Sequence, residues 1–338
     1  MTQELPGLDL ARLRDHLDEH SPGLVQGPLT GEVVQGGRSN LTYVVGDGTG
    51  RWVVRRPPLG HVLPTAHDMS REHRVISALG HTAVPVPRTI TLCQDTDVIG
   101  APFYVMEFVE GTPYRSASEL EPLGEHRTKA IAGALVDTLV DLHAVDPSAV
   151  GLGDFGRPEG FLERQVRRWG KQLDGSRSRD LPGIDDLREQ LARAIPASGP
   201  AAVVHGDYRL DNVLVDSRDR ITAVLDWEMS TLGDPLTDLA LLVAYAERGK
   251  VDLEIVSNVS TAPGYPGTDE VIAQYAARSG RDVSALDWYV GFAFFKLAVI
   301  LEGIYYRFSQ GQTVGEGFDQ IGAAVVPLVT LGLETLKD

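Results

Sequence analysis

The feature that most constrains the fold is a short block of strand-like sequence enclosed by helical sequence on both sides. It contains three apolar runs, at 201–204, 213–215 and 221–225. The turn residues at 216–220 join the last two runs as a predicted β-hairpin. Polar residues gather where the runs end, in the segment 205–212 and at Asp226. The hairpin is therefore expected to return Asp226 to the neighbourhood of that segment.

The first 110 residues predict a small α+β region. Its expected elements are a helix over 8–20, strands over 41–45 and 52–55, a helix over 68–79 and a strand over 103–109. Beyond Glu110 and Gly111 helical patterns dominate, beginning with 125–143. We therefore predict an α+β fold of two lobes, a β-rich N-terminal lobe at 1–110 and a larger, mainly helical lobe at 111–338.

Charge and cysteine content narrow the class of partner. The chain carries 31 Lys and Arg against 47 Asp and Glu, a net charge of −16, which argues against a surface for nucleic acid or anionic membrane. Cys93 is the sole cysteine, so no intrachain disulfide can form. The apolar stretch 288–306 is interrupted by charges and predicts a buried core helix. With no secretory signal visible, we expect a cytoplasmic protein; its oligomeric state is not predicted.

The polar cluster has the composition that phosphoryl transfer from a metal nucleotide requires. Asp207 precedes Asn212 by five residues, and Asp226 follows after the hairpin. One acid would receive the proton of the attacking hydroxyl, while the amide oxygen and the other acid would bind Mg²⁺ as hard oxygen ligands. Arg209 would place a permanent positive charge on the transferring phosphoryl group. We predict Asp207, Arg209, Asn212 and Asp226 as catalytic residues, with Asn212 and Asp226 as metal ligands.

At these residues the chain resembles the aminoglycoside phosphotransferase and choline kinase family, which shares the protein-kinase fold. His205-x-Asp207-x4-Asn212 is similar to the catalytic loop of that family, and Asp226 to its metal-binding acid. The segment 233–240 extends the resemblance. Within the family, the amino-acid sequences of 54–57 and 221–228 most resemble those of the kinase-like domain fused to acyl-CoA dehydrogenases. The resemblance implies transfer of the γ-phosphoryl of ATP or GTP, with Mg²⁺, to a hydroxyl on a small molecule, such as a hydroxyacyl metabolite.

The resemblance also implies that the N-terminal lobe binds the nucleotide. The expected nucleotide-binding residues are Gly36, Gly37 and Ser39 of a phosphate-covering loop, Val53 and Arg55 on one strand face, Glu72 as the partner of Arg55, and the hinge residues Glu107 and Val109. The family has a lysine where this chain has Arg55, whose planar fork cannot copy the geometry of an ammonium group.

Two alternatives stay open at this point. Arg55 and the glycine-poor loop are consistent with a nucleotide-binding pseudokinase, and a non-catalytic module that binds an acyl or coenzyme ligand is the second rival. Several nearby polar residues have structural interpretations. His205 is expected to orient the catalytic loop, Asp234 to cap a helix that begins near Pro235, and Asp238 to support that helix's first turn. Lys296 is expected to be paired or to lie at the edge of its apolar helix.

Overall fold

The computed structural model describes residues 5–34, 40–60, 67–248, 258–311 and 318–337. The chain forms two compact units. One contains the residues up to Gly111 together with Thr222–Ser230, and the other contains Thr112–Ile221 together with the residues from Thr231 onward. The segment 222–230, which the sequence analysis placed in the second lobe, therefore groups with the first unit.

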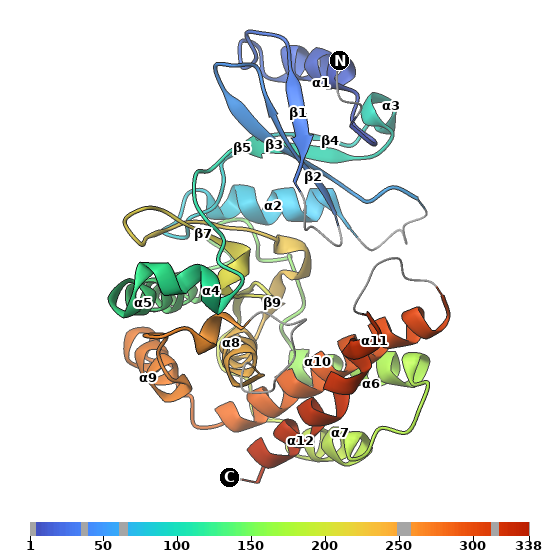
Figure 1. The fold of residues 1–338 in the computed structure, drawn as a ribbon, viewed down its shortest axis with the longest axis vertical. Helices are drawn as coiled ribbons and strands as arrows, with labels where there is room; N and C mark the ends of the chain where they lie inside the picture. The colour runs from blue at the N-terminus through green and yellow to red at the C-terminus, as the bar shows by residue number, and fades with distance from the viewer. Residues whose placement is uncertain (1–4, 35–39, 61–66, 249–257, 312–317, 338) are drawn as a thin grey trace. The chain divides into compact units, whose positions relative to one another are not determined.

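The first unit is built on a five-stranded antiparallel sheet in the order β1-β2-β3-β5-β4 (Figure 1). Its strands are β1 (Thr30–Val33), β2 (Leu41–Gly46), β3 (Arg51–Arg56), β4 (Thr89–Cys93) and β5 (Phe103–Glu107), and its helices are α1 (Leu10–His20), α2 (Met69–Leu79) and α3 (Thr96–Ile99). The β2–β3 turn is fixed by Asp47, whose carboxylate accepts from the N–H groups of Thr49 and Gly50. The two edge strands, β1 and β4, were not predicted from the sequence, because both are short and only partly buried.

The two faces of this sheet have different partners. Leu13 and Leu17 of α1 pack with Tyr43, Trp52 and other buried residues of one face. The opposite face carries Arg55, which lies across the ladder from Tyr104. The hydroxyl of Tyr104 donates to Glu72 of α2 at 3.0 Å. The alternation of side chains along β3 thus separates an apolar core from a face with charged residues.

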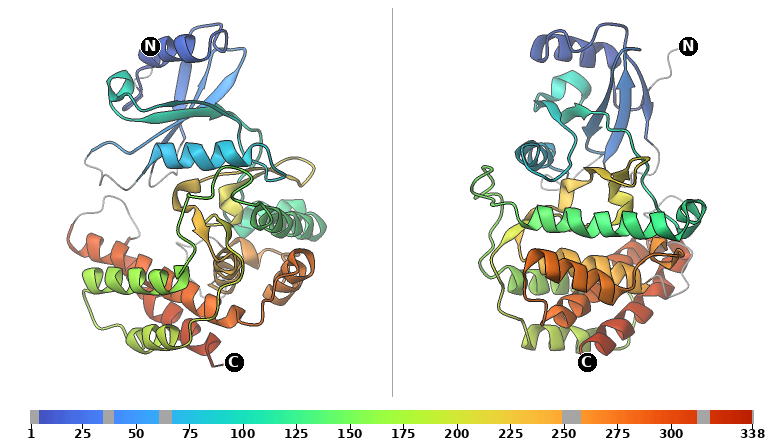
Figure 2. Two further views of the ribbon diagram at one scale, coloured as in Figure 1. Left: turned by 180° about the vertical axis from the view of Figure 1, so that it is seen from behind. Right: turned by 90° about the vertical axis from the view of Figure 1, so that its left-hand side faces the viewer.

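The second unit is mainly helical. Its helices are α4 (Ala117–Leu120), α5 (Glu125–His143), α6 (Phe161–Ser176), α7 (Ile184–Arg193), α8 (Leu236–Arg248), α9 (Thr268–Ser279), α10 (Leu286–Ser309), α11 (Phe318–Ile321) and α12 (Val325–Thr335). Helix α10 packs along α6, α8 and α12 (Figure 2). By length and composition α10 is the one described helix apolar enough to cross a membrane, but 72% of its apolar window is buried inside the protein, as the sequence analysis expects of a core helix.

Short strands interrupt the helices where the sequence predicts them. β6 (Ala202–Val204) pairs with β9 (Thr231–Gly233), which the sequence analysis did not predict. β7 (Val213–Val215) and β8 (Ile221–Val224) form the predicted hairpin. Its turn is held by Asp216, which accepts from the backbone of Arg218 and Arg220. Helix α8 begins as predicted, with the side chain of Asp234 accepting from the N–H of Leu236.

Candidate active site

The predicted catalytic loop leaves β6 and ends in a short 3-10 helix, Leu210–Asn212. Gly206 has a φ of 86°, a left-handed conformation that side chains disfavour. Asp238 of α8 holds this part of the loop, because its carboxylate accepts from the N–H of His205 at 2.6 Å and from the N–H of Gly206 at 2.8 Å. Asp238 therefore ties back to the loop in addition to lying in the first turn of its helix.

A second layer of buried residues supports Asp238. His143 of α5 places Nε2 at 3.3 Å from its carboxylate, and Nδ1 of His143 lies 2.7 Å from the hydroxyl of Tyr275. Burial lowers the pKa of His143, so the imidazole is neutral and donates from Nε2. Burial alone would raise the pKa of Asp238, but the hydrogen bonds from His143 and from the loop lower it below its usual value. Asp238 consequently stays a carboxylate.

Asp207 is held by three neighbours of the loop and of α8. Oδ1 accepts from the hydroxyl of Tyr245 at 2.6 Å, and Oδ2 accepts from Nδ2 of Asn212 at 3.1 Å. Nε of Arg209 lies 3.6 Å from Oδ2. The side chain of Asp207 remains 30% exposed, so its carboxylate can still meet a ligand. The structure thus brings together three predicted residues, Asp207, Asn212 and Arg209, whose catalytic roles stay predictions.

The backbone on both sides of Asp207 is also fixed. The N–H of Asp207 donates to Nδ1 of His205 at 3.2 Å, which confirms the orienting contact expected of His205. Nζ of Lys296 donates to the carbonyl of Gly206 at 2.8 Å, and burial lowers the pKa of this lysine. The carboxylate of Asp238 thus holds the N–H of Gly206, and the ammonium group of Lys296 holds its carbonyl. Lys296 is hydrogen-bonded to a neutral carbonyl of the catalytic loop, and the described structure shows no ion pair for it.

Arg209 contacts acids of its own loop. Its Nη2 lies 2.7 Å from a carboxylate oxygen of Asp211, and its guanidinium stands 5.2 Å from the centre of the Tyr245 ring. Burial raises the pKa of Asp211. Tyr245 was not predicted as a site residue, although its position seven residues after Asp238 places both on one face of α8.

The first unit gathers a different group of charges around Arg55. Nε of Arg55 lies 2.8 Å from Oε2 of Glu72, and Nη2 donates to Asp226. The predicted ion pair of Arg55 and Glu72 is therefore present. Asp226 adopts a φ of 65°, a left-handed backbone conformation that is uncommon outside glycine. Burial alone would lower the pKa of Arg55, but Glu72 and its other acidic neighbours raise it.

Glu72 is the most deeply buried acid of this group, with 1% of its side chain exposed. Burial raises its pKa to about 7, against the opposing effect of Arg55. Nδ2 of Asn40 donates to Glu72 at 2.8 Å and to Glu228 at 3.2 Å, and so links two acids. The buried Oδ1 of Asn40 has no hydrogen-bond partner among the described residues. Asn40 was not predicted as a site residue, since its link between Glu72 and Glu228 appears only in the tertiary structure.

Of the remaining predicted nucleotide-binding residues, some lie within the described ranges and others lie outside them. Gly36, Gly37 and Ser39 lie outside the described residues. Val53 shares its face of β3 with Arg55. The N–H of Glu107 donates to the carbonyl of Arg88 at 2.9 Å, so this amide is already bonded. Within the described ranges, the backbone of Val109 has no hydrogen-bond partner.

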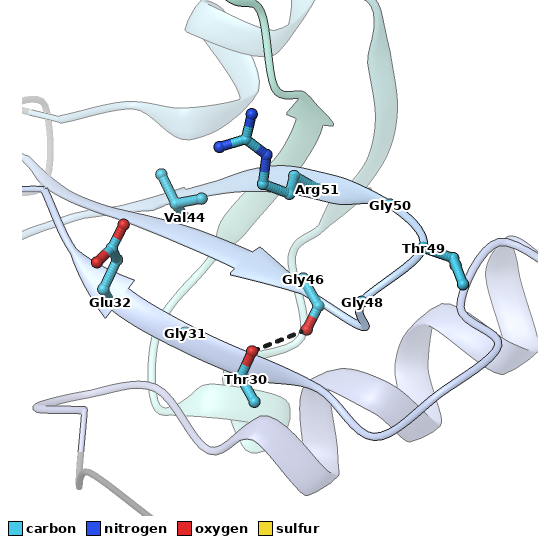
Figure 3. A pocket seen from close by; sticks show the side chains of 9 residues that line it. All are labelled: Thr30, Gly31, Glu32, Val44, Gly46, Gly48, Thr49, Gly50 and Arg51. Carbon is cyan, nitrogen blue, oxygen red and sulfur yellow. Dashed lines mark hydrogen bonds between the residues drawn. The ribbon is translucent and has the colours of Figure 1, made fainter.

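A cavity of about 540 Å³ opens beside β1, β2 and β3 (Figure 3). It lies on the face of the sheet that also carries Val53 and Arg55. The shared face follows from the register, because Val44 lies opposite Val53 and Gly46 lies opposite Arg51. The cavity is lined by Thr30, Gly31, Glu32, Val44, Gly46, Gly48, Thr49, Gly50 and Arg51. Its volume is in the range of small-molecule pockets.

The predicted metal ligands have the right donor chemistry for magnesium. Nδ2 of Asn212 is engaged by Asp207, so its amide oxygen is left to face a ligand. Asp226 uses Oδ1 for Arg55, and its Oδ2 meets no donor in the described part of the chain. Amide and carboxylate oxygens are hard ligands that suit Mg²⁺. Nowhere in the described ranges do three or more His, Cys, Asp or Glu side chains gather as a metal site.

Known proteins resemble this chain both in sequence and in structure. The chain is 35% identical over 335 residues to acyl-CoA dehydrogenase family member 11 of Rattus norvegicus, which covers 96% of this chain and 43% of the relative. It therefore spans less than half the length of this curated relative. A crystal structure of a candidate aminoglycoside phosphotransferase from Ralstonia eutropha has a TM-score of 0.85 and 33% identity, covering 97% of this chain and 98% of that one.

More distant structures share the fold. Aminoglycoside phosphotransferase APH(4)-Ia, in a ternary complex with AMP-PNP and hygromycin B, has a TM-score of 0.60 at 14% identity, over 96% of this chain and 97% of that one. These likenesses confirm the predicted α+β kinase-like fold and the resemblance to the region matched in acyl-CoA dehydrogenase proteins. Residues 30–288 match the profile described as the phosphotransferase enzyme family, and the chain belongs to that family.

Proposed function

We propose that this chain transfers the γ-phosphoryl group of ATP or GTP to a hydroxyl group of a small molecule, with Mg²⁺ as cofactor. The observation that carries the proposal is the carboxylate of Asp207, partly exposed and bonded to Asn212 five residues later. A fixed carboxylate that accepts the proton of an alcohol, beside an amide oxygen that binds the metal, is the arrangement this reaction uses.

Each polar residue then has a defined task. Asp207 accepts the proton of the attacking hydroxyl, while Asp238, His205 and Lys296 hold its loop in place. Asn212 and Asp226 would hold Mg²⁺, which neutralises charge on the phosphate oxygens when it is bound. Arg55 and Arg209 supply positive charge toward the phosphates, and Glu72 positions Arg55.

The nucleotide is proposed to lie along the face of the sheet that carries the cavity, Val53 and Arg55. Arg51 and Arg55 are four residues apart on β3, which is roughly 13 Å along a strand. This length accommodates a nucleoside at the cavity end and its phosphates at Arg55. The complex of APH(4)-Ia with AMP-PNP is consistent with a nucleoside triphosphate as donor.

The relatives also guide the choice of acceptor. The match to an acyl-CoA dehydrogenase family member favours a hydroxyacyl thioester or a related metabolite, and hygromycin B in the complex of APH(4)-Ia makes aminoglycosides the second class to test. With its single cysteine and acidic balance, the protein is proposed to act in the cytoplasm on small molecules, with neither nucleic acid nor membrane as partner.

Substitution of the proposed base tests this function. Purified protein with MgATP is screened for acceptor-dependent ADP release using hydroxybutyryl-CoA, sugars, amino alcohols and aminoglycosides. With the best acceptor, Asp207→Ala is expected to lower kcat by about 10²- to 10⁴-fold, since general-base catalysis contributes that much. Asp180→Ala is the control, because the side chain of Asp180 is 89% exposed and its loss leaves transfer unchanged. Undiminished transfer by Asp207→Ala would remove Asp207 as the base.

A nucleotide-binding pseudokinase is the second candidate, favoured by the double pairing of Arg55 with Glu72 and Asp226. An arginine that is already neutralised in this way has less positive charge to offer to phosphate. This candidate predicts that MgATP raises the melting temperature while no acceptor causes its consumption. A module that binds only an acyl or coenzyme ligand would instead be stabilised by coenzyme A, with no response to MgATP.

A further inference from the structure

Tyr245 is hydrogen-bonded to the carboxylate of Asp207, the proposed base. Its hydroxyl donates to Oδ1 of Asp207 at 2.6 Å, whereas Oδ2 is engaged by Asn212 at 3.1 Å and by Arg209 at 3.6 Å. Asn212 and Arg209 belong to the same loop as Asp207, but Tyr245 comes from α8. In the described part of the chain, the hydrogen bond that Asp207 accepts from α8 therefore lies on Oδ1, the oxygen that the catalytic loop leaves unused.

A cation and a small cavity lie next to the ring of Tyr245. The guanidinium of Arg209 stands 5.2 Å from the ring centre. The ring also borders a cavity of about 20 Å³ that is lined by Leu242, Ser260, Tyr265 and others. Such a volume holds about one water molecule, so the packing beside the ring is not completely filled by side chains.

We propose that the hydroxyl of Tyr245 holds the position on Asp207 that the acceptor hydroxyl must take, so that an acceptor releases the base whereas water does not. The inference rests on the proposed function. A small-molecule acceptor brings binding energy from its other contacts to offset the loss of the Tyr245 bond. Water has no such contacts, so in its presence Tyr245 stays on Asp207. Tyr245 is in this sense a specificity-determining residue that suppresses hydrolysis of the nucleotide.

The chemistry of the step is the same for both acceptors. The acceptor hydroxyl gives its proton to Oδ1 of Asp207, and its oxygen forms a bond to the γ-phosphorus. The bond from the γ-phosphorus to the bridging oxygen breaks, and its electron pair leaves with the nucleoside diphosphate. With an alcohol the product is a phosphate ester, and with water it is inorganic phosphate. Tyr245 donates a hydrogen bond before this step and transfers no proton.

Tyr245→Phe removes the hydroxyl and keeps the ring. ADP release from MgATP is measured with and without hydroxybutyryl-CoA or the best acceptor from the screen. In the variant, acceptor-independent hydrolysis is expected to rise by about tenfold, the effect of losing one hydrogen bond to a charged group. The ratio of transfer to hydrolysis is expected to fall by a similar factor. The melting temperature of the variant shows that the fold is retained.

Tyr265→Phe is the matched control, because Tyr265 lines the same small cavity and makes no contact with Asp207 in the described structure. It is expected to leave the ratio of transfer to hydrolysis unchanged. An active Tyr245→Phe variant with the wild-type ratio, or with transfer and hydrolysis lowered together, overturns the inference alone. A wild-type protein that consumes no ATP with water or with any acceptor overturns the proposed function, and the inference falls with it.

Discussion

In the first unit, Glu72 and Asp226 share one guanidinium and Asn40 links Glu72 to Glu228, whereas in the second unit Asp207 is bonded to a phenol and an amide. The first group holds more acids than cations, and burial raises the pKa of Glu72 to about 7. The loop of the second group is fixed through backbone N–H groups by Asp238, whose pKa lies below its usual value.

Because of this difference, the groups around Arg55 and around Asp207 are expected to respond differently to pH and to substitution. Contacts between buried ions depend on the protonation of Glu72 and on the presence of each partner. Hydrogen bonds from neutral donors and backbone amides to an ionised acid do not change near neutral pH. Nucleotide binding is thus expected to respond to pH through the first unit, while the geometry around Asp207 stays constant.

The largest effect is expected from Arg55→Met. The substitution leaves the buried carboxylate of Glu72 without its cation, which typically costs about 3 to 5 kcal/mol in the free energy of unfolding. Urea unfolding at pH 8, above the wild-type Glu72 pKa of about 7, measures this loss. The double variant Arg55→Met with Glu72→Gln should recover much of it, because no uncompensated charge then remains. Losses that simply add in the double variant would show that the two residues do not interact.

The next effect is expected from Asp238→Asn, which tests the support of the catalytic loop. The new amide group presents N–H donors where a carboxylate oxygen accepted, so one loop N–H is left unpaired at a cost of about 2 to 3 kcal/mol. Transfer per folded molecule should fall as well, since Asp207 loses its fixed position.

Asp234→Asn is the matched control for this variant. Asp234 is also buried at the start of α8, but it bonds Leu236 and Tyr289 and not the loop. Its substitution should lower stability and leave transfer per folded molecule intact. Equal losses of transfer in both variants would contradict a specific role of Asp238.

The smallest effect concerns the pH dependence of stability. The pKa of Glu72 is about 7 in the folded state, against 4.5 for an unperturbed glutamate side chain. The folded state therefore binds more protons between these values, and its stability falls as pH rises from about 4.5 to 7. This group contributes on the order of 2 kcal/mol to that fall.

Glu72→Gln should remove this part of the slope, which urea midpoints measured from pH 5 to 8 can show. Glu19→Gln, with a side chain 79% exposed, serves as the control with an unchanged slope. A slope that is identical in the wild type and in Glu72→Gln would indicate that another group is responsible.

Local sequence was sufficient where the partners lie close along the chain. Asp207, Arg209 and Asn212 fall within one loop, so their spacing predicted that they meet, whereas the pair of Arg55 and Glu72 was expected from the family resemblance. Tyr245 and Asn40 were missed because their contacts are tertiary, and neither residue stands in a distinctive local pattern. The edge strands β1 and β4 were missed because partial burial removes the apolar alternation that marks a strand.

The division of the chain has a consequence for attempts to study its parts separately. Residues 222–230 belong with the first unit, while the chain before and after them belongs to the second. The polypeptide therefore passes from one unit to the other three times, and no single cut yields two complete pieces. A truncated product ending at Gly111 would lack Asp226 and Glu228, and Arg55 would lose one of its two counterions. Reconstitution of the first unit by itself would need residues 222–230 supplied as a peptide or fused to residues 1–111.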